Sequence, residues 1–274
     1  ELLPFSISEL EQRPINALPL NLLGADFLKY RWPGLPGAKA SPAALEKYLE
    51  LGGLPGVCFT RGPRNRQDLL ETQLSLILDR DLRLVCDTQL PLRRLRVLAE
   101  ALATLQNRPL NLTDLKRRTR ISEPTLRKVL AGLESIFFIR YLPCEGDETH
   151  SVTFLEDQGE AHYLASGTFE SASAIERLAF ANLRVPFHYL AQEPFQMFQY
   201  RRHGGAYVPL AFRVGKKVLG FIVEQEDSPS LSSTRSSQSF RDRYPQAKVV
   251  FLHPGKNLRV LNRDEASAPI RIFL

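Results

Sequence analysis

The residues with the clearest chemical purpose are six cations and one hydroxyl between positions 116 and 128. They are Lys116, Arg117, Arg118, Arg120, Thr125, Arg127 and Lys128. Residues 86–146 contain eleven lysines and arginines against six acids, a net charge of +5 out of +6 for the whole chain. Lys and Arg side chains bind phosphates and release the counterions condensed on nucleic acid. We therefore predict that these seven residues contact nucleic acid, with duplex DNA as the expected form.

The leucine spacing around these cations predicts two helices joined by a tight turn. Asn111 is a suitable N-cap for the first helix, whose Leu115 faces inward while the cations face outward. Ser122 is a suitable N-cap for the second helix, and Pro124 falls in its first turn, where a missing N–H costs nothing. Leucines at 126, 130 and 133 then repeat at the spacing of an amphipathic helix.

A further helix at 92–106 and a β-prone run at 137–141 flank this pair. Three helices followed by a strand predict a winged helix-turn-helix over residues 86–146, whose last helix reads a groove of the nucleic acid. Winged helices also bind proteins, and Glu123 at the start of the last helix is unfavourable beside a phosphate backbone. A protein-interaction or oligomerisation module that binds an acidic protein therefore stays open as the alternative.

The remaining residues offer little catalytic chemistry. Cys58, Cys86 and Cys144 form no CxxC pair and predict reduced thiols in a cytoplasm, with neither a disulfide nor a zinc site. The five histidines show no metal-ligand spacing, and neither a GxSxG nucleophile motif nor a GxxxxGK[ST] phosphate loop occurs. We expect no catalytic residue, no metal and no cofactor in this chain. ATP and Mg²⁺ are expected only if an ATPase core exists N-terminal to it.

Length and composition predict a soluble, cytoplasmic α+β protein of several domains. Of the 274 residues, 43% are hydrophobic, and no apolar run reaches the roughly 18 residues that span a membrane. Prolines divide the first forty residues into short helical pieces at 7–13 and 20–30, and longer helices are predicted at 41–51 and 67–85. Residues 1–85 therefore predict a proline-rich, helical region. Because the chain starts at Glu1 and not at Met, we expect it to be part of a longer protein.

Residues 147–274 predict a mixed α/β domain. A strand at 152–155 and a helix ending near Ala165 precede a longer helix at 173–185, with Arg177 and Arg184 on its polar side. Segment 228–239 is rich in serine and predicts a loop. Strands are predicted at 187–191, 197–201, 207–214, 217–226, 248–253 and 270–274.

Four segments, taken in order, form a recognisable series. They are ELLPFSISEL at 1–10, LGGLPGV at 51–57, LILDRDL at 76–82 and FLEDQGEAHYL at 154–164. Together with the winged helix they resemble the C-terminal two-thirds of prokaryotic AAA+ ATPases of the archaeal-ATPase type. The resemblance implies that residues 1–85 abut an ATPase core absent from this chain. It also implies that residues 147–274 have a restriction-endonuclease-like PD-(D/E)XK fold.

The resemblance places a degenerate nuclease site at Glu176, Pro209, Glu224 and Glu226. Such nucleases need an acid on each of two strands to hold a divalent metal, and a lysine to position water. Pro209 stands where the first acid is expected. If Glu224 is the second acid, Glu226 replaces the lysine; if the register is two residues earlier, Ile222 replaces the acid. In either register we expect no nuclease activity.

These observations predict a non-catalytic, nucleic-acid-binding C-terminal region of an AAA+ ATPase. The alternative is a protein-interaction or oligomerisation module of that ATPase, whose basic face binds the ATPase core or an acidic protein. No membrane partner is expected under either hypothesis, and an oligomer is compatible with both.

Overall fold

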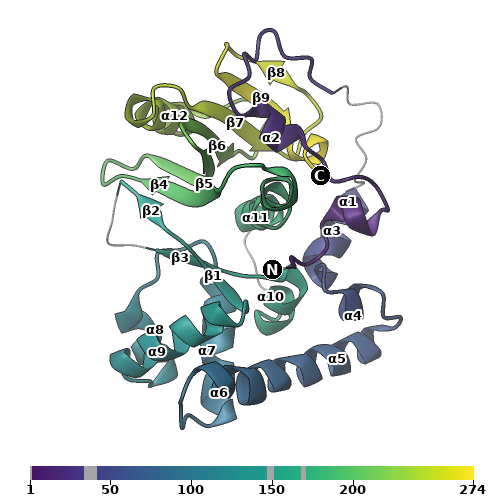
Figure 1. Ribbon diagram of the computed structural model, residues 1–274, viewed down its shortest axis with the longest axis vertical. Helices are drawn as coiled ribbons and strands as arrows, with labels where there is room; N and C mark the ends of the chain where they lie inside the picture. Colours follow the sequence, from purple (N-terminus) through teal and green to yellow (C-terminus); the bar gives the residue numbers. More distant parts are fainter. Residues whose placement is uncertain (1, 34–41, 147–150, 168–170) are drawn as a thin grey trace. The chain divides into compact units, whose positions relative to one another are not determined.

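The computed structural model describes residues 2–33, 42–146, 151–167 and 171–274, and its fold is mixed α and β (Figure 1). The chain forms two compact units. Unit 1 comprises the described parts of Glu1–Phe5, Glu46–Leu142 and His150–Phe169, and unit 2 those of Ser6–Leu45, Pro143–Thr149 and Glu170–Leu274. These units do not follow the predicted ranges 1–85, 86–146 and 147–274. The chain passes between them more than once, which no local sequence pattern signals.

Unit 1 is mainly helical. Its helices include most of α3 (Pro42–Leu51), then α4 (Pro55–Cys58), α5 (Pro63–Ser75), α6 (Leu82–Val85), α7 (Leu92–Thr104), α8 (Leu112–Thr119), α9 (Glu123–Ser135) and α10 (Gln158–Leu164). Strands β1 (Ile139–Leu142) and β3 (Val152–Leu155) pair antiparallel, with Ile139 opposite Leu155. The predicted inner leucines at 115, 126, 130 and 133 are all buried in one core with residues of α7.

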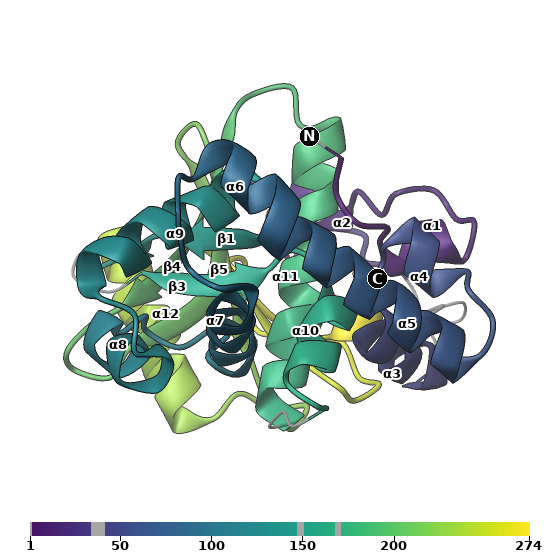
Figure 2. The ribbon, with the colours of Figure 1, turned by 90° about the horizontal axis from the view of Figure 1, so that it is seen from below.

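A π-helical segment, Leu76–Asp81, joins α5 to α6 in one continuous rod (Figure 2). The helix predicted at 67–85 is therefore present, although it begins earlier, at Pro63. Arg83 pairs with Asp79 at 3.0 Å and donates to the carbonyl oxygens of Thr88 at 2.7 Å and Leu90 at 2.9 Å. Arg83 thus fixes the turn that leads from the rod into α7.

The carboxylate of Asp157 joins distant segments at the centre of unit 1. Its Oδ2 accepts the backbone N–H groups of Gly53 at 2.7 Å and Leu54 at 3.2 Å. Its Oδ1 accepts those of Gly159 at 2.8 Å and Glu160 at 3.0 Å, and so caps the N-terminus of α10. One buried side chain therefore satisfies four backbone donors that would otherwise lack partners.

Close backbone approach at this junction requires glycine. A Cβ atom on Gly53 would lie 2.1 Å from the carbonyl oxygen of Phe5, and one on Gly159 would lie 2.3 Å from that of Leu51. The N–H of Phe5 in turn donates to the carbonyl oxygen of Gly53 at 2.9 Å. Parts of the segments at 1–10, 51–57 and 154–164 thus meet in one place.

Glu160 is a second carboxyl group buried beside Asp157. Its Oε1 accepts a hydrogen bond from Nε2 of Gln73 on α5 at 3.2 Å. Burial raises the pKa of Glu160 well above its usual value, and the negative charge of Asp157 raises this pKa further. Burial raises the pKa of Asp157 as well, but its four N–H donors act in the opposite direction, so Glu160 is the harder of the two carboxyl groups to ionise.

Unit 2 is built on a seven-stranded mixed sheet with the order β2-β4-β5-β6-β7-β9-β8. The strands are β2 (Cys144–Glu145), β4 (Phe195–Arg201), β5 (Tyr207–Val214), β6 (Lys217–Val223), β7 (Lys248–His253), β8 (Arg259–Val260) and β9 (Glu265–Pro269). Strands β4, β5 and β6 are antiparallel neighbours, whereas β6, β7 and β9 run parallel. The parallel strands place their carboxyl ends along one edge of the sheet.

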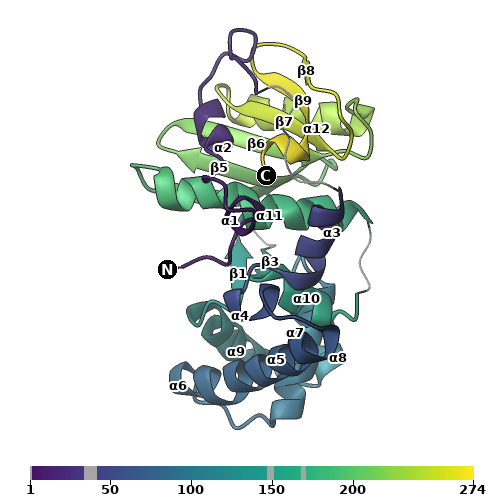
Figure 3. The ribbon, with the colours of Figure 1, turned by 90° about the vertical axis from the view of Figure 1, so that its right-hand side faces the viewer.

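Two helices, α11 (Ser171–Leu190) and α12 (Leu231–Arg243), cover opposite faces of this sheet. On one face Phe187 of α11 stacks on Phe212 of β5 with ring centroids 4.1 Å apart. On the other face Phe240 of α12 lies against Gly220 of β6, where a Cβ would be 2.8 Å from the Phe240 ring. Figure 3 shows α11 lying along the sheet. The sheet is thus the middle layer of unit 2.

The structure corrects several predictions for residues 147–274. Residues 187–190 continue α11 as helix and do not form a strand, because Phe187 packs inward as part of that helix. The serine-rich segment is helix α12, capped by Ser230, whose Oγ accepts the N–H of Ser233. The chain ends in a 3₁₀ helix, Ile270–Ile272, and the last strand is β9. Arg177 and Arg184 are buried and do not lie on a polar face; the Arg184 guanidinium lies 4.5 Å from the centroid of the Phe180 ring.

The N-terminal segment belongs mostly to unit 2. Helices α1 (Ile7–Leu10) and α2 (Leu18–Leu22) are shorter than predicted, because the backbone turns to positive φ at Gln12 (55°) and at Gly24 (99°). Ser6 and Glu9 form a capping box at α1, and the N–H of Ile7 donates to Oδ1 of Asn182 on α11 at 2.8 Å. Ser41, the first residue of the helix predicted at 41–51, lies outside the described residues. Within the described ranges, no helix has the length and apolar character needed to cross a bilayer.

We expect Asp157→Asn to lower the free energy of unfolding of the chain by about 2–4 kcal/mol, because the amide loses one acceptor oxygen and leaves two buried N–H groups unpaired. Urea denaturation followed by circular dichroism measures this change. The matched control is Asp114→Asn on exposed α8, which should change stability by less than about 0.5 kcal/mol. Equal effects of the two substitutions would contradict a central role for Asp157.

Candidate functional site

The seven residues predicted to contact nucleic acid lie on α8, on α9 and in the turn between them. Six of them are exposed cations, and Thr125 is half-buried. The side chains of Arg117, Arg118 and Arg127 are 81%, 47% and 65% exposed. We call the six cations (Lys116, Arg117, Arg118, Arg120, Arg127 and Lys128) the basic face. None of these cations is sealed inside the core of unit 1.

Local acids partly neutralise the basic face. Asp114 pairs with Arg117 at 2.6 Å and with Arg118 at 2.7 Å, and Glu123 pairs with Arg127 at 2.7 Å. The hydrogen bond from Arg117 is the main reason that the pKa of Asp114 is lowered. Acids and arginines three or four residues apart on one helix form such pairs, so these ion pairs could have been predicted from the sequence.

Two cations of the basic face, Lys116 and Arg120, have no ion-pair partner among the described residues. Arg120 ends α8 in the left-handed conformation, with φ of 56°, and its N–H donates to the carbonyl oxygen of Lys116 at 2.9 Å. A non-glycine residue in this conformation is uncommon and fixes the direction of the turn. Lys116 and Arg120 are therefore the cations most open to a phosphate.

The caps of the two helices differ. Asn111 caps α8 as predicted, because its Oδ1 accepts the N–H groups of Thr113 at 2.9 Å and Asp114 at 3.1 Å. Ser122 does not cap α9 through its side chain; its Oγ contacts Oγ1 of Thr125 at 2.8 Å instead. Ser122 is thus the N-cap residue of α9, as predicted, but it makes no side-chain cap hydrogen bond.

Helix α9 packs closely on α6, which limits its movement. A Cβ atom on Gly132 would lie 2.8 Å from both Cβ of Cys86 and Cδ1 of Leu82. One helical turn earlier, Nζ of Lys128 donates to the backbone carbonyl of Asp87. The α5–α6 rod therefore holds the helix that presents Arg127 and Lys128.

The predicted degenerate nuclease residues lie in unit 2, and the structure explains Pro209. The pairing of β4 with β5 shifts register between Tyr200 opposite Val208 and Phe198 opposite Ala211, so that Pro209 falls in a bulge. Its neighbour Leu210 is the first residue of β5 paired with β6. Proline has no N–H to donate, and bulges are among the few places where a sheet accepts it.

Glu224, which follows β6, has a structural partner. Its Oε1 accepts the N–H of Ser230 at 3.0 Å and the Ser230 hydroxyl at 3.3 Å, immediately before α12. Glu226 is exposed, and Glu176 is half-buried on α11. Within the described residues, no three His, Cys, Asp or Glu side chains are arranged to hold a metal ion. These glutamates thus form no ligand set there.

A buried histidine that was not predicted as a site residue lies at the same edge of the sheet as Glu224. His253 ends β7 with no exposed surface, and its Nδ1 lies 3.1 Å from Oδ1 of Asp227. Neither ring nitrogen has a hydrogen bond of good geometry. Burial lowers the pKa of His253, while the charge of Asp227 acts in the opposite direction. The signal available in the sequence was a histidine ending a buried apolar strand, directly before Pro254 and Gly255.

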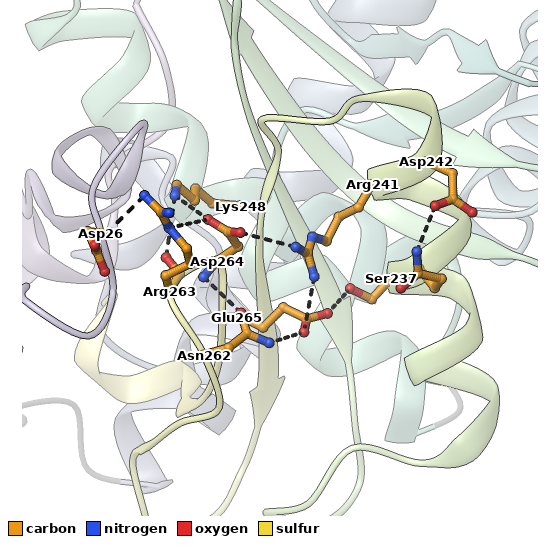
Figure 4. Close-up of polar contacts among 10 residues, drawn as sticks. Asp26, Ser237, Arg241, Asp242, Lys248, Asn262, Arg263, Asp264 and Glu265 are labelled. Carbon is orange, nitrogen blue, oxygen red and sulfur yellow. Dashed lines mark hydrogen bonds and ion pairs between the residues drawn. The ribbon is translucent and has the colours of Figure 1, made fainter.

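A dense network of charges lies at the other ends of β7 and β9 (Figure 4). Arg241 of α12 pairs with Asp264 at 3.1 Å and Glu265 at 3.3 Å, and Lys248 pairs with Asp264 at 2.5 Å. The hydroxyl of Ser237 donates to Glu265. Because Arg241 and Ser237 of α12 bind Asp264 and Glu265 at the start of β9, the network holds α12 on the sheet.

Comparisons with known proteins identify one similarity. A family model described as a domain of unknown function (DUF8612) matches residues 42–152. The matched range includes α3 to α9 and therefore the whole basic face. No curated protein and no solved structure matches the chain.

We expect the stability of the chain to fall on acidification because of His253. The pKa of His253 in the folded state lies below its value in the unfolded state. The stability that this difference contributes is therefore present above about pH 6.5 and is lost as the pH falls through the folded-state pKa. Urea denaturation at pH 7 and pH 5 should show a smaller loss for His253→Gln than for the wild type. His203→Gln, at an exposed turn, should behave as the wild type; a His253→Gln profile identical to the wild type would contradict the assignment.

Proposed function

We propose that this chain is a non-catalytic nucleic-acid-binding region, with duplex DNA as the preferred form. Its basic face is the binding surface, and unit 2 contains a degenerate nuclease-like fold. The observation that supports this proposal most directly is the exposure of all six cations on two adjacent helices and their turn. Lys116 and Arg120, without ion-pair partners among the described residues, supply the first phosphate contacts.

The arrangement of elements supports a winged helix-turn-helix. Helices α7, α8 and α9 follow one another and share one core, and β1 and β3 form the small antiparallel sheet expected after them. In such units the last helix enters the major groove with its N-terminal residues towards the bases. Thr125 and Arg127 would then lie nearest the bases, and Lys116 and Arg120 nearest the backbone.

The origin of unit 2 as a nuclease-like fold is part of the proposal. Strands β5 and β6 are neighbours, as the two acid-bearing strands of a PD-(D/E)XK nuclease must be. Pro209 occupies a bulge, and Glu224 is bonded to Ser230. We infer that this fold positions or binds nucleic acid without cutting it.

The AAA+ ATPase relationship is also a proposal. It is supported by the four sequence segments and their order; three of them, at 1–10, 51–57 and 154–164, also contact one another in unit 1. An ATPase core elsewhere in the protein would supply ATP and Mg²⁺ chemistry to this region. In our proposal, no residue of unit 1 or unit 2 takes part in that ATP and Mg²⁺ chemistry.

A protein-interaction module is the second candidate, favoured by a specific observation. Unit 1 exposes several large apolar side chains, with Leu84 at 80%, Val85 at 53% and Phe137 at 54% exposure. Exposed apolar side chains are a feature of protein-binding surfaces. The ion pairs of Asp114 and Glu123 also reduce the charge that the basic face offers to DNA. The binding experiment below separates the two candidates.

We expect wild-type chain to bind a duplex oligonucleotide at low salt, with affinity falling steeply as salt rises. Replacing both free cations, as Lys116→Gln with Arg120→Asn, should weaken binding about tenfold at low salt. The slope of log K against log salt should fall by about 2, close to 0.9 for each lost phosphate contact. Asparagine is chosen because it tolerates the left-handed conformation of residue 120. Fluorescence anisotropy measures both quantities.

The control for this experiment is Arg80→Ala, which removes an exposed cation paired with Asp81 elsewhere in unit 1. It should leave the affinity and the salt slope within about twofold of wild type. If the wild type does not bind duplex DNA even at 20–50 mM salt, the nucleic-acid proposal is wrong and the protein-interaction candidate replaces it.

We also expect no nuclease activity. Supercoiled plasmid incubated with the chain and either Mg²⁺ or Mn²⁺ should remain uncut, because an acid and the lysine of the metal site are both missing. Agarose gel electrophoresis gives the result. Nicking that disappears in Glu224→Gln and persists in Glu226→Gln would show instead that Glu224 still serves a metal centre.

A further inference from the structure

Unit 1 contains a cavity of about 370 Å³ that the proposed function does not use. It opens between the end of α3, α4, the first two turns of α5 and the end of α10. Pockets that bind small molecules have volumes of about 300–1,000 Å³ and mostly apolar walls with a few polar groups. The cavity is at the small end of this range.

The apolar part of the cavity is built from buried side chains. Val57 has no exposed surface, and Leu51 and Leu70 are 7% and 6% exposed. The elements that carry them are held by the Asp157 junction, which fixes Gly53 just before α4 and begins α10. The wall is therefore held in place by the fold itself, and a rigid wall lowers the ordering cost of binding.

The polar part of the cavity favours a negative charge. Arg66 lines it half-buried, and its Nη1 donates to the carbonyl oxygen of Thr60 at 3.4 Å, which leaves the other guanidinium donors available. His162 lines the cavity from α10. The lining acid is Glu50, which is exposed. Helix α5 also begins here with no acid in its first turn, so that its positive end is not neutralised by its own side chains.

We propose that this cavity binds a small organic anion, in which an apolar ring or chain is attached to one sulfonate, carboxylate or phosphate group. The apolar body lies on Leu51 and Leu70, which keep a small exposed surface above the fully buried Val57, and the anionic group pairs with the Arg66 guanidinium. A charge-assisted hydrogen bond to Arg in a partly desolvated site is strong enough to select the anion over a neutral ligand of the same shape. This inference does not depend on nucleic-acid binding.

Two fluorescent probes of nearly equal shape test the proposal on the whole chain. They are 1-anilinonaphthalene-8-sulfonate, which is anionic, and N-phenyl-1-naphthylamine, which lacks the sulfonate. Wild-type chain should bind the anionic probe saturably at one site and at least tenfold more tightly than the neutral probe. Arg66→Ala should weaken the anionic probe about tenfold and change the neutral probe by less than twofold. Arg64→Ala, on the same helix and outside the cavity lining, should change neither.

A second variant tests whether both probes occupy the cavity. Gln67 is an exposed lining residue, and Gln67→Trp should fill the opening and weaken both probes at least tenfold while the circular dichroism spectrum stays unchanged. The proposal is overturned if the anionic probe binds without saturation, or if Arg66→Ala and Arg64→Ala have equal effects. It is also overturned if folded Gln67→Trp binds both probes as the wild type does.

Discussion

Unit 1 depends on one buried carboxylate. Asp157 accepts four backbone N–H groups, two from the start of α10 and two from the turn before α4. A neutral side chain could not satisfy four donors from two directions, and the close approach of Asp157 to Gly52 leaves no room there for a Cβ atom. The neighbouring Glu160, whose pKa is raised by burial and by the charge of Asp157, is the harder of the two carboxyl groups to ionise.

The junction also determines where other parts of unit 1 lie. Helix α10 packs on α5 and α7, and α5 continues through the π segment into α6. Because α6 meets α9 at Gly132 with almost no free space, the orientation of α9 follows from that of the rod. The basic face is therefore presented by a rigid support. Under the proposed function, rigid presentation would help the cations to match phosphates at fixed spacing.

Sequence patterns predicted α5, α7 and α9 of unit 1 well, because each of these helices buries leucines at regular spacing. They failed at α12, whose buried residues are Ser236, Ser237 and Phe240 and therefore give no apolar stripe. Its stability comes from contacts across the fold, such as Ser237 with Glu265. The cations of the basic face could be predicted because they follow from composition alone. The bond of Glu224 to Ser230 and the burial of His253 could not be predicted in this way. Those features join residues that only the folded sheet brings together.

Strand β2 has a consequence for solubility. It lies between β1 and β3 in the chain, yet it pairs with β4 as the outer strand of the larger sheet, at Cys144 and Glu145. Glu145 is fastened there by Arg213 and Tyr244. Without this two-residue strand, β4 would offer a free edge of seven residues for pairing with other molecules. A short piece of the chain thus covers the edge of β4 at Gln199 and Tyr200 and shortens the stretch open to pairing with other molecules.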